Sequence, residues 1–87
     1  MAQPSYAVHY LGGVSAKSKE VLTSTSILTD FPTATCLIMK TNGVKVSIDG
    51  TDAFPVDYGE ITYLETGHSY IFTKDCSLSV GKFKVIT

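Results

Sequence analysis

Apolar and polar residues alternate along much of this chain, in short runs that end at glycine, proline or asparagine. In residues 5–11 the alternation puts Tyr6, Val8 and Tyr10 on one face of a predicted strand, and Gly12-Gly13 then predicts a turn. Residues 76–80 and 82–87 alternate in the same way on either side of Gly81, which predicts a final pair of strands. A period of two is typical of strands with one buried and one exposed face. The pattern therefore predicts an all-β chain.

The clearest element is TCLIMKTNGVKVSIDG, residues 35–50, in which two apolar runs flank Asn42-Gly43. Both turn residues tolerate positive φ angles, so the pair predicts a two-residue hairpin turn. The second run would direct Val44, Val46 and Ile48 inward. The first run, residues 36–39, is apolar on both faces, which indicates a strand covered on both sides or an outer face buried against a partner.

The other segments are less regular. Residues 15–22 could begin a short helix, whereas residues 23–29 are rich in β-branched residues and predict an edge strand that ends by Pro32. Residues 51–59 are predicted to connect strands, because Pro55 is incompatible with a central strand. Residues 60–75 predict two strands around a turn at residues 66–68. Together these segments predict one domain, residues 1–87, folded as a small antiparallel β-sandwich of seven to nine short strands.

Composition supports a folded domain and argues against nucleic acid as a partner. Hydrophobic residues make up 44% and charged residues 17% of the 87 positions, which excludes the composition of a disordered chain. The net charge is -1, and all the basic residues are scattered lysines, whereas binding to duplex nucleic acid needs clustered cations. Five carboxylates follow one another without an intervening lysine, and we expect them on a solvated loop and hairpin face. They are Asp49, Asp52, Asp57, Glu60 and Glu65.

No residue pattern predicts a catalytic, cofactor or metal site. His68 and Ser69 are adjacent, but neighbouring residues of a strand point to opposite faces, so they cannot act as a catalytic pair. The aspartates of residues 49–57 lack the glycine and terminal glutamate of a calcium loop. Cys36, Cys76, His9 and His68 lack the short spacings of structural zinc sites. We therefore predict a protein without enzymatic activity.

The sequence also carries expectations about the compartment. Residues 1–13 do not show the cationic and apolar pattern of a signal peptide, and no apolar run approaches the roughly 18 residues of a membrane helix. We therefore expect synthesis in a cytoplasm, where Cys36 and Cys76 stay reduced and pack as small apolar side chains.

VKVSIDG (residues 44–50), followed by GEITYLETGHSYIFTKDCSLSVGKFKVIT (residues 59–87), resembles the C-terminal half of small β-sandwich virion structural proteins of tailed phages. The resembling features are a strand, a glycine-containing turn before a Tyr or Phe strand, an SLSV-G strand and a final strand. The resemblance implies a compact sandwich that performs no chemistry. It also implies a homo-oligomer, a trimer ahead of a dimer, in contact with other virion proteins such as a major capsid protein.

These observations lead us to expect a non-enzymatic virion structural protein, either a capsid decoration (cement) protein or a fibre-type subunit. It would be made in the host cytoplasm without a signal peptide and reside in the virion. One alternative is a small cytoplasmic β-domain that binds a peptide by adding it to an exposed sheet edge. Another is a carbohydrate-binding sandwich that uses the aromatic side chains of Tyr58, Tyr63 and Tyr70.

Overall fold

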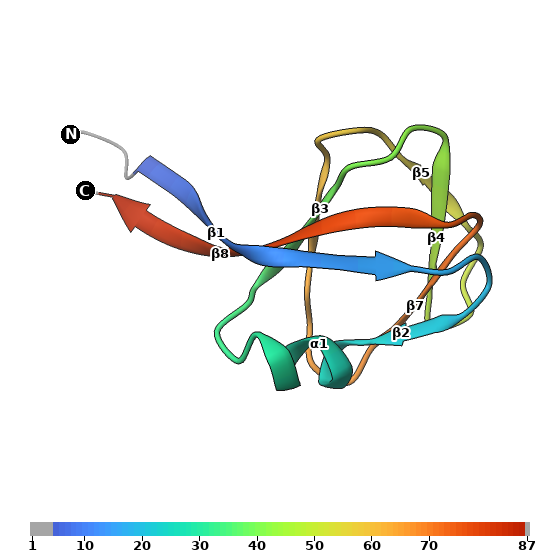
Figure 1. The fold of residues 1–87 in the computed structure, drawn as a ribbon, viewed down its shortest axis with the longest axis horizontal. Helices are drawn as coiled ribbons and strands as arrows, with labels where there is room; N and C mark the ends of the chain where they lie inside the picture. Colours follow the sequence, from blue (N-terminus) through green and yellow to red (C-terminus); the bar gives the residue numbers. More distant parts are fainter. Residues whose placement is uncertain (1–4, 87) are drawn as a thin grey trace.

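The computed structural model describes the backbone of residues 5–86 and the side chains of residues 7–84 (Figure 1). Its eight strands form two antiparallel sheets of four strands, with one short helix, which confirms the predicted β-sandwich. The first sheet has the order β1 (Ser5–Ala16), β8 (Cys76–Ile86), β3 (Cys36–Met39), β6 (Ile61–Tyr63). The second has the order β2 (Val21–Thr23), β7 (Ser69–Phe72), β4 (Val44–Ile48), β5 (Phe54–Val56). The helix α1 (Ser24–Asp30) follows β2 directly.

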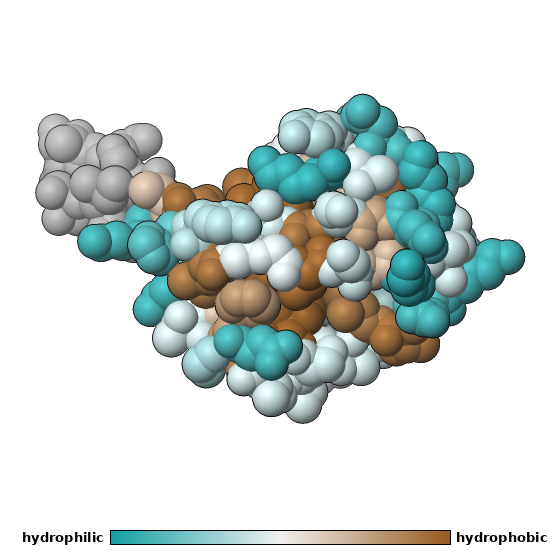
Figure 2. All heavy atoms as spheres, in the orientation of Figure 1, coloured by the Kyte–Doolittle hydropathy of each residue, from teal (hydrophilic) through white to brown (hydrophobic). Residues whose placement is uncertain are grey.

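The core lies between the two sheets and is formed by alternate residues of their strands. Val44 and Val46 of β4 are buried as the alternation predicts, and Ile48 is half-buried against the same core. Tyr70 and Phe72 of β7 are also buried. The face of the molecule in Figure 2 shows hydrophobic atoms in the middle, around β1, and hydrophilic atoms around the turns at the right margin. The core is therefore a single layer between two sheets.

The glycines of β1 and β8 do not make turns, which corrects two sequence predictions. β1 continues through Gly12-Gly13 to Ala16, and β8 continues through Gly81 as one strand. A Cβ atom on Gly12 would lie 2.6 Å from the Phe31 ring, and one on Gly81 would lie 2.5 Å from Cγ1 of Val8. Both glycines therefore serve close packing. A register shift between Tyr10 and Gly12 bulges β1 and changes which face its following residues occupy.

The N-terminal end of β1 and the C-terminal end of β8 extend beyond the rest of the sandwich. β3 pairs with β8 only from Met39↔Leu78 to Cys36↔Gly81, whereas β1 pairs with β8 as far as Ser5↔Ile86. Residues 5–9 and 82–86 thus form a two-stranded projection, called the arm below (Figure 1). The molecule measures 44 Å along its longest axis and 26 and 22 Å across it.

The turn at Asn42-Gly43 connects the two sheets. Gly43 has a φ of 72°, as predicted, but β3 belongs to the first sheet and β4 to the second, so the prediction of a hairpin is wrong. The strands on either side of the turn at Gly67, β6 and β7, are divided between the sheets in the same way. Two strands facing each other across a core show the same alternation as two strands of one hairpin, so the pattern alone could not separate these arrangements.

Residues 23–29, predicted as an edge strand, instead end β2 and form most of α1. The Oγ1 atom of Thr23 accepts the backbone N–H of Ser26 at 3.2 Å and so caps the helix. Ile27 is buried in the core, and the Oγ atom of buried Ser24 accepts the N–H of Gly67 at 3.0 Å. These tertiary contacts outweigh the β propensity of the segment. Residues 15–22 do not begin a helix, and within residues 5–86 no helix is long and apolar enough to cross a membrane.

Candidate functional site

The outer face of the first sheet carries apolar residues on all four strands. In its register Tyr10, Gly81, Cys36 and Tyr63 form one row from β1 to β6. The apolar residues of this outer face, called the apolar face below, are Val8, Tyr10, Cys36, Ile38, Ile61, Tyr63 and Phe83. Ser15, Ser77 and Ser79 lie on the same side of the sheet. Tyr10 is 62% exposed, Tyr63 66% and Ile61 43%. The sequence of each strand shows apolar residues at these outward positions. The order of the four strands, which brings these residues onto one face, was not evident from the sequence.

The apolar face is partly packed against itself. The rings of Tyr63 and Phe83 lie with centroids 5.2 Å apart. Cys36 points away from the core, yet it is fully buried close to Gly81, and this burial raises the pKa of its thiol. Ile38, the other outward residue of β3, is half-buried. The run at 36–39, apolar on both faces, therefore corresponds to a strand with Leu37 and Met39 in the core and an apolar outer surface.

The four residues of the nominal zinc set are not brought together. Cys76 lies in the core, on the opposite face of the first sheet from Cys36, and both thiols are unpaired. His9 lies in the arm, and His68 lies before β7. Within the described residues, no three or more potential ligands cluster as a metal site would require. Burial also raises the pKa of the Cys76 thiol.

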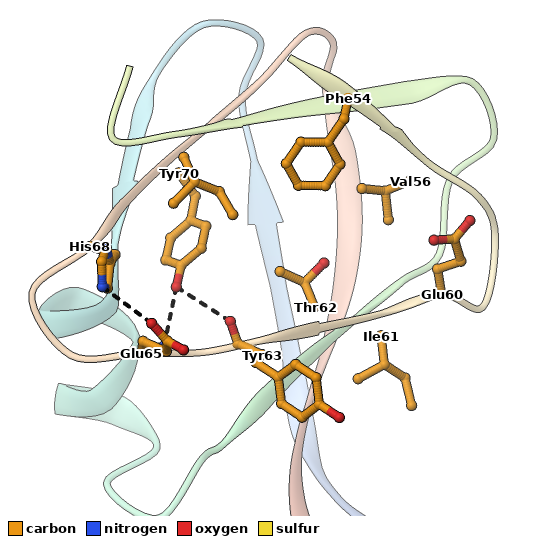
Figure 3. A pocket seen from close by; sticks show the side chains of 10 residues that line it. Phe54, Val56, Glu60, Ile61, Thr62, Tyr63, Glu65, His68 and Tyr70 are labelled. Carbon is orange, nitrogen blue, oxygen red and sulfur yellow. Dashed lines mark hydrogen bonds and ion pairs between the residues drawn. The ribbon is translucent and has the colours of Figure 1, made fainter. Parts of the chain in front are cut away.

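A pocket of about 310 Å³ opens where β5 and β6, the edge strands of the two sheets, lie beside each other (Figure 3). Phe54 and Val56 of β5, Ile61 of β6 and Tyr70 of β7 give it apolar walls. Charged side chains stand at its ends, Glu60 at one and Glu65 with His68 at the other. This edge pocket is a second feature that the sequence did not reveal, because its walls come from both sheets.

His68 is held between two carboxylates at one end of the edge pocket. Its Nδ1 atom hydrogen-bonds Asp49, and its Nε2 atom lies 3.2 Å from Oε2 of Glu65. The hydrogen bond and charge of Asp49 raise the pKa of His68. The backbone N–H of Ser69, 2.9 Å from Oδ1 of Asp49, and the His68 hydrogen bond lower the pKa of Asp49. With a carboxylate at each ring nitrogen, His68 holds the turn after β4 to the turn before β7.

This arrangement does not form a catalytic serine–histidine pair. The Ser69 hydroxyl lies 3.4 Å from Oδ1 of Asp49, and both ring nitrogens of His68 face carboxylates. A general base needs a free nitrogen within reach of the nucleophile, so the pair lacks the geometry of nucleophilic catalysis. The adjacency in the sequence reflects a structural contact with Asp49 that both residues share.

The remaining candidate side chains lie in the loops and the core. Asp52 and Asp57 are exposed, and Oε1 of Glu60 accepts the N–H of Asp57 at 3.0 Å. Tyr58 is exposed, with Nζ of Lys40 5.4 Å from the centre of its ring. Tyr70 is buried, and its hydroxyl accepts the N–H of Glu65 at 3.1 Å. Tyr58, Tyr63 and Tyr70 therefore do not form the shared exposed aromatic surface that a carbohydrate site would use.

Comparison with known proteins adds no relative to this description. No family model matches the chain, and neither a search of curated proteins nor a search of solved structures finds a match.

Proposed function

We propose that the protein is a non-enzymatic assembly subunit whose copies associate through the apolar face. The observation that carries this proposal is the exposure of Tyr10, Tyr63 and Ile61 on one side of one sheet. Contiguous apolar patches on soluble proteins usually mark interaction sites, and tyrosine is among the residues that contribute most to binding energy at interfaces. The apolar face is thus the surface that association would bury.

The edge of the first sheet supports the same proposal. β1 is a twelve-residue strand with β8 on one side only. It contains no lysine or proline, the residues that commonly discourage pairing of exposed edges. An edge of this kind favours association with another chain.

We place this subunit in a virion, as a capsid decoration (cement) protein or a fibre-type subunit. The resemblance of residues 44–50 and 59–87 to such proteins supports this setting, and it also supports a trimer ahead of a dimer. A further partner would then be another virion protein, such as a major capsid protein. This role requires no catalysis, since the subunit acts by assembling with other proteins.

Two tyrosine substitutions test the proposal against a matched control. The double variant Tyr10→Gln, Tyr63→Gln removes aromatic surface from the apolar face without adding charge. Tyr58→Gln removes a tyrosine of similar exposure, 58%, that lies outside this face. Sedimentation velocity should show that the double variant raises the dissociation constant of the oligomer by about tenfold or more. The control should sediment as the wild type, and equal sedimentation of all three proteins would refute the apolar face as the interface.

A further inference from the structure

The charges of the chain are divided between two regions. Residues 46–73 contain five carboxylates and no lysine. His68 is the one side chain among them that can carry a positive charge. Residues 76–87 contain Lys82 and Lys84 and no carboxylate, and residues 1–16 contain no carboxylate either. The carboxylates of the first region include those at the edge pocket, whereas the two lysines lie in the arm. The molecule therefore has an acidic edge and a basic projection.

The arm presents its lysines on one side. Lys82 and Lys84 are exposed and separated by one residue of β8, so both point away from the side that Phe83 occupies. Two such positions are about 7 Å apart along a strand. Lys82 pairs with exposed His9 of β1, which places an imidazole beside the two lysines. Where Figure 2 colours the arm, hydrophilic atoms lie beside hydrophobic ones.

The edge pocket has the features that a lysine side chain needs. A lysine packs its four-carbon stem on apolar surface and extends its ammonium group to a carboxylate or to water. Phe54 and Val56 supply apolar walls, Ile61 lines the outer side of the pocket's mouth, and Glu60 and Glu65 stand at opposite ends (Figure 3). Oε1 of Glu60 already accepts the N–H of Asp57. Among the described residues, its Oε2 atom makes no hydrogen bond or ion pair.

We propose that the arm of one copy docks at the edge pocket of the next copy, with Lys82 and Lys84 directed to Glu60 and Glu65. The arm points away from β5 in Figure 1, so it does not reach the pocket of its own molecule. A contact between two different surfaces is head-to-tail, and it closes into a ring where the rotation between copies permits. A trimeric ring is one such closure. This inference rests on the proposed function, since it adds to the apolar face a second pair of surfaces through which neighbouring copies meet.

Charge reversal at each surface separately should weaken association. The arm variant is Lys82→Glu, Lys84→Glu, and the pocket variant is Glu60→Lys, Glu65→Lys. Each places like charges opposite one another, so each should raise the dissociation constant by about tenfold or more. Glu60→Lys alone, which leaves the contact of Glu65 with His68 intact, should change it in the same direction. Circular dichroism and melting establish that each variant is folded before its mass is measured by sedimentation.

A control variant separates local contact from net charge. Lys45→Glu, Lys74→Glu makes the same change in net charge as the arm variant, on exposed residues outside the arm. It should sediment as the wild type. If it dissociates the oligomer as strongly as the arm variant does, net charge is responsible and the docking proposal is wrong.

Recombining the reversed surfaces completes the test. The chain that carries both the arm and the pocket reversals has an acidic arm and a basic pocket, so its mass should return to that of the wild type. An equimolar mixture of the arm and pocket variants should also associate, because every contact between unlike chains pairs opposite charges. A ring of three cannot alternate two kinds of chain, so this mixture should form open or even-numbered assemblies and not the closed trimer. Reversals that leave the mass unchanged, or that both weaken association without recovery in the combined chain and in the mixture, would overturn the docking proposal. A monomeric wild type would instead overturn the proposed function itself.

Discussion

His68 makes structural contacts with two carboxylates, and its position in the sequence did not indicate both of them. Its partners Asp49 and Glu65 lie on different turns, so one imidazole holds two turns together. The raised pKa of His68 favours the cation, and the lowered pKa of Asp49 favours the carboxylate. The sequence predicted only that His68 and Ser69 would not form a catalytic pair. It could not predict the contact with Asp49, because that contact depends on how β4 and β7 pair.

The stability of the protein should depend on pH through this contact. The pKa of His68 is raised above its usual 6.5, so its stabilising contribution is complete below pH 6.5 and is lost as pH rises through the folded-state value. The pKa of Asp49 is lowered below its usual 3.8, so its contribution is present above pH 3.8 and is lost as pH falls through the folded-state value. The difference in melting temperature between the wild type and His68→Gln should therefore be largest between pH 3.8 and 6.5. A difference that persists unchanged at alkaline pH would show that His68 stabilises the fold as a neutral side chain.

At the scale of elements, the sequence predicted strands well and their partners poorly. Alternation located β3, β4 and β7 within a few residues, because it reports burial directly. It ended the first strand at residue 11, although β1 continues to Ala16, and it divided β8 into two strands. It did not distinguish a turn within a sheet from a turn between sheets, and it took Gly12 and Gly81 as turn signals. The structure shows that both glycines admit a neighbouring side chain. The apolar face and the edge pocket follow from strand order, which is why neither was evident before the sheets were known.

Gly81 should behave as a packing residue of β8 and resist even a methyl group. A Cβ at this position would lie 2.5 Å from Cγ1 of Val8 and 3.2 Å from Sγ of Cys36. Gly81→Ala should therefore reduce the free energy of unfolding by about 1–3 kcal/mol, as overpacking does elsewhere. Urea denaturation measures this change.

Val8→Ala provides the matched control for Gly81→Ala, because it removes the Cγ1 atom that the new methyl group would meet. The double variant should recover part of the loss, so that the two changes cost less together than the sum of their separate costs. Strict additivity would mean that the cost of Gly81→Ala does not arise from the contact with Val8.

At the scale of the whole molecule, a small sandwich exposes an apolar outer face, a long open edge, a basic arm and an acid-rimmed pocket. The first two favour association in general, and the last two give it a direction. A domain of 87 residues has only one modest core. Apolar residues on its outer surface are therefore removed from water only by contact with another molecule.

The central claim is that this protein acts as an assembled subunit, and the mass of the wild-type protein in solution tests it most directly. Sedimentation equilibrium across the micromolar range should give a species whose mass is a multiple of the chain's 9.4 kDa, with a trimer ahead of a dimer. A single species of 9.4 kDa at every concentration would contradict the claim. It would instead favour a monomeric domain that binds a peptide at the open edge of β1.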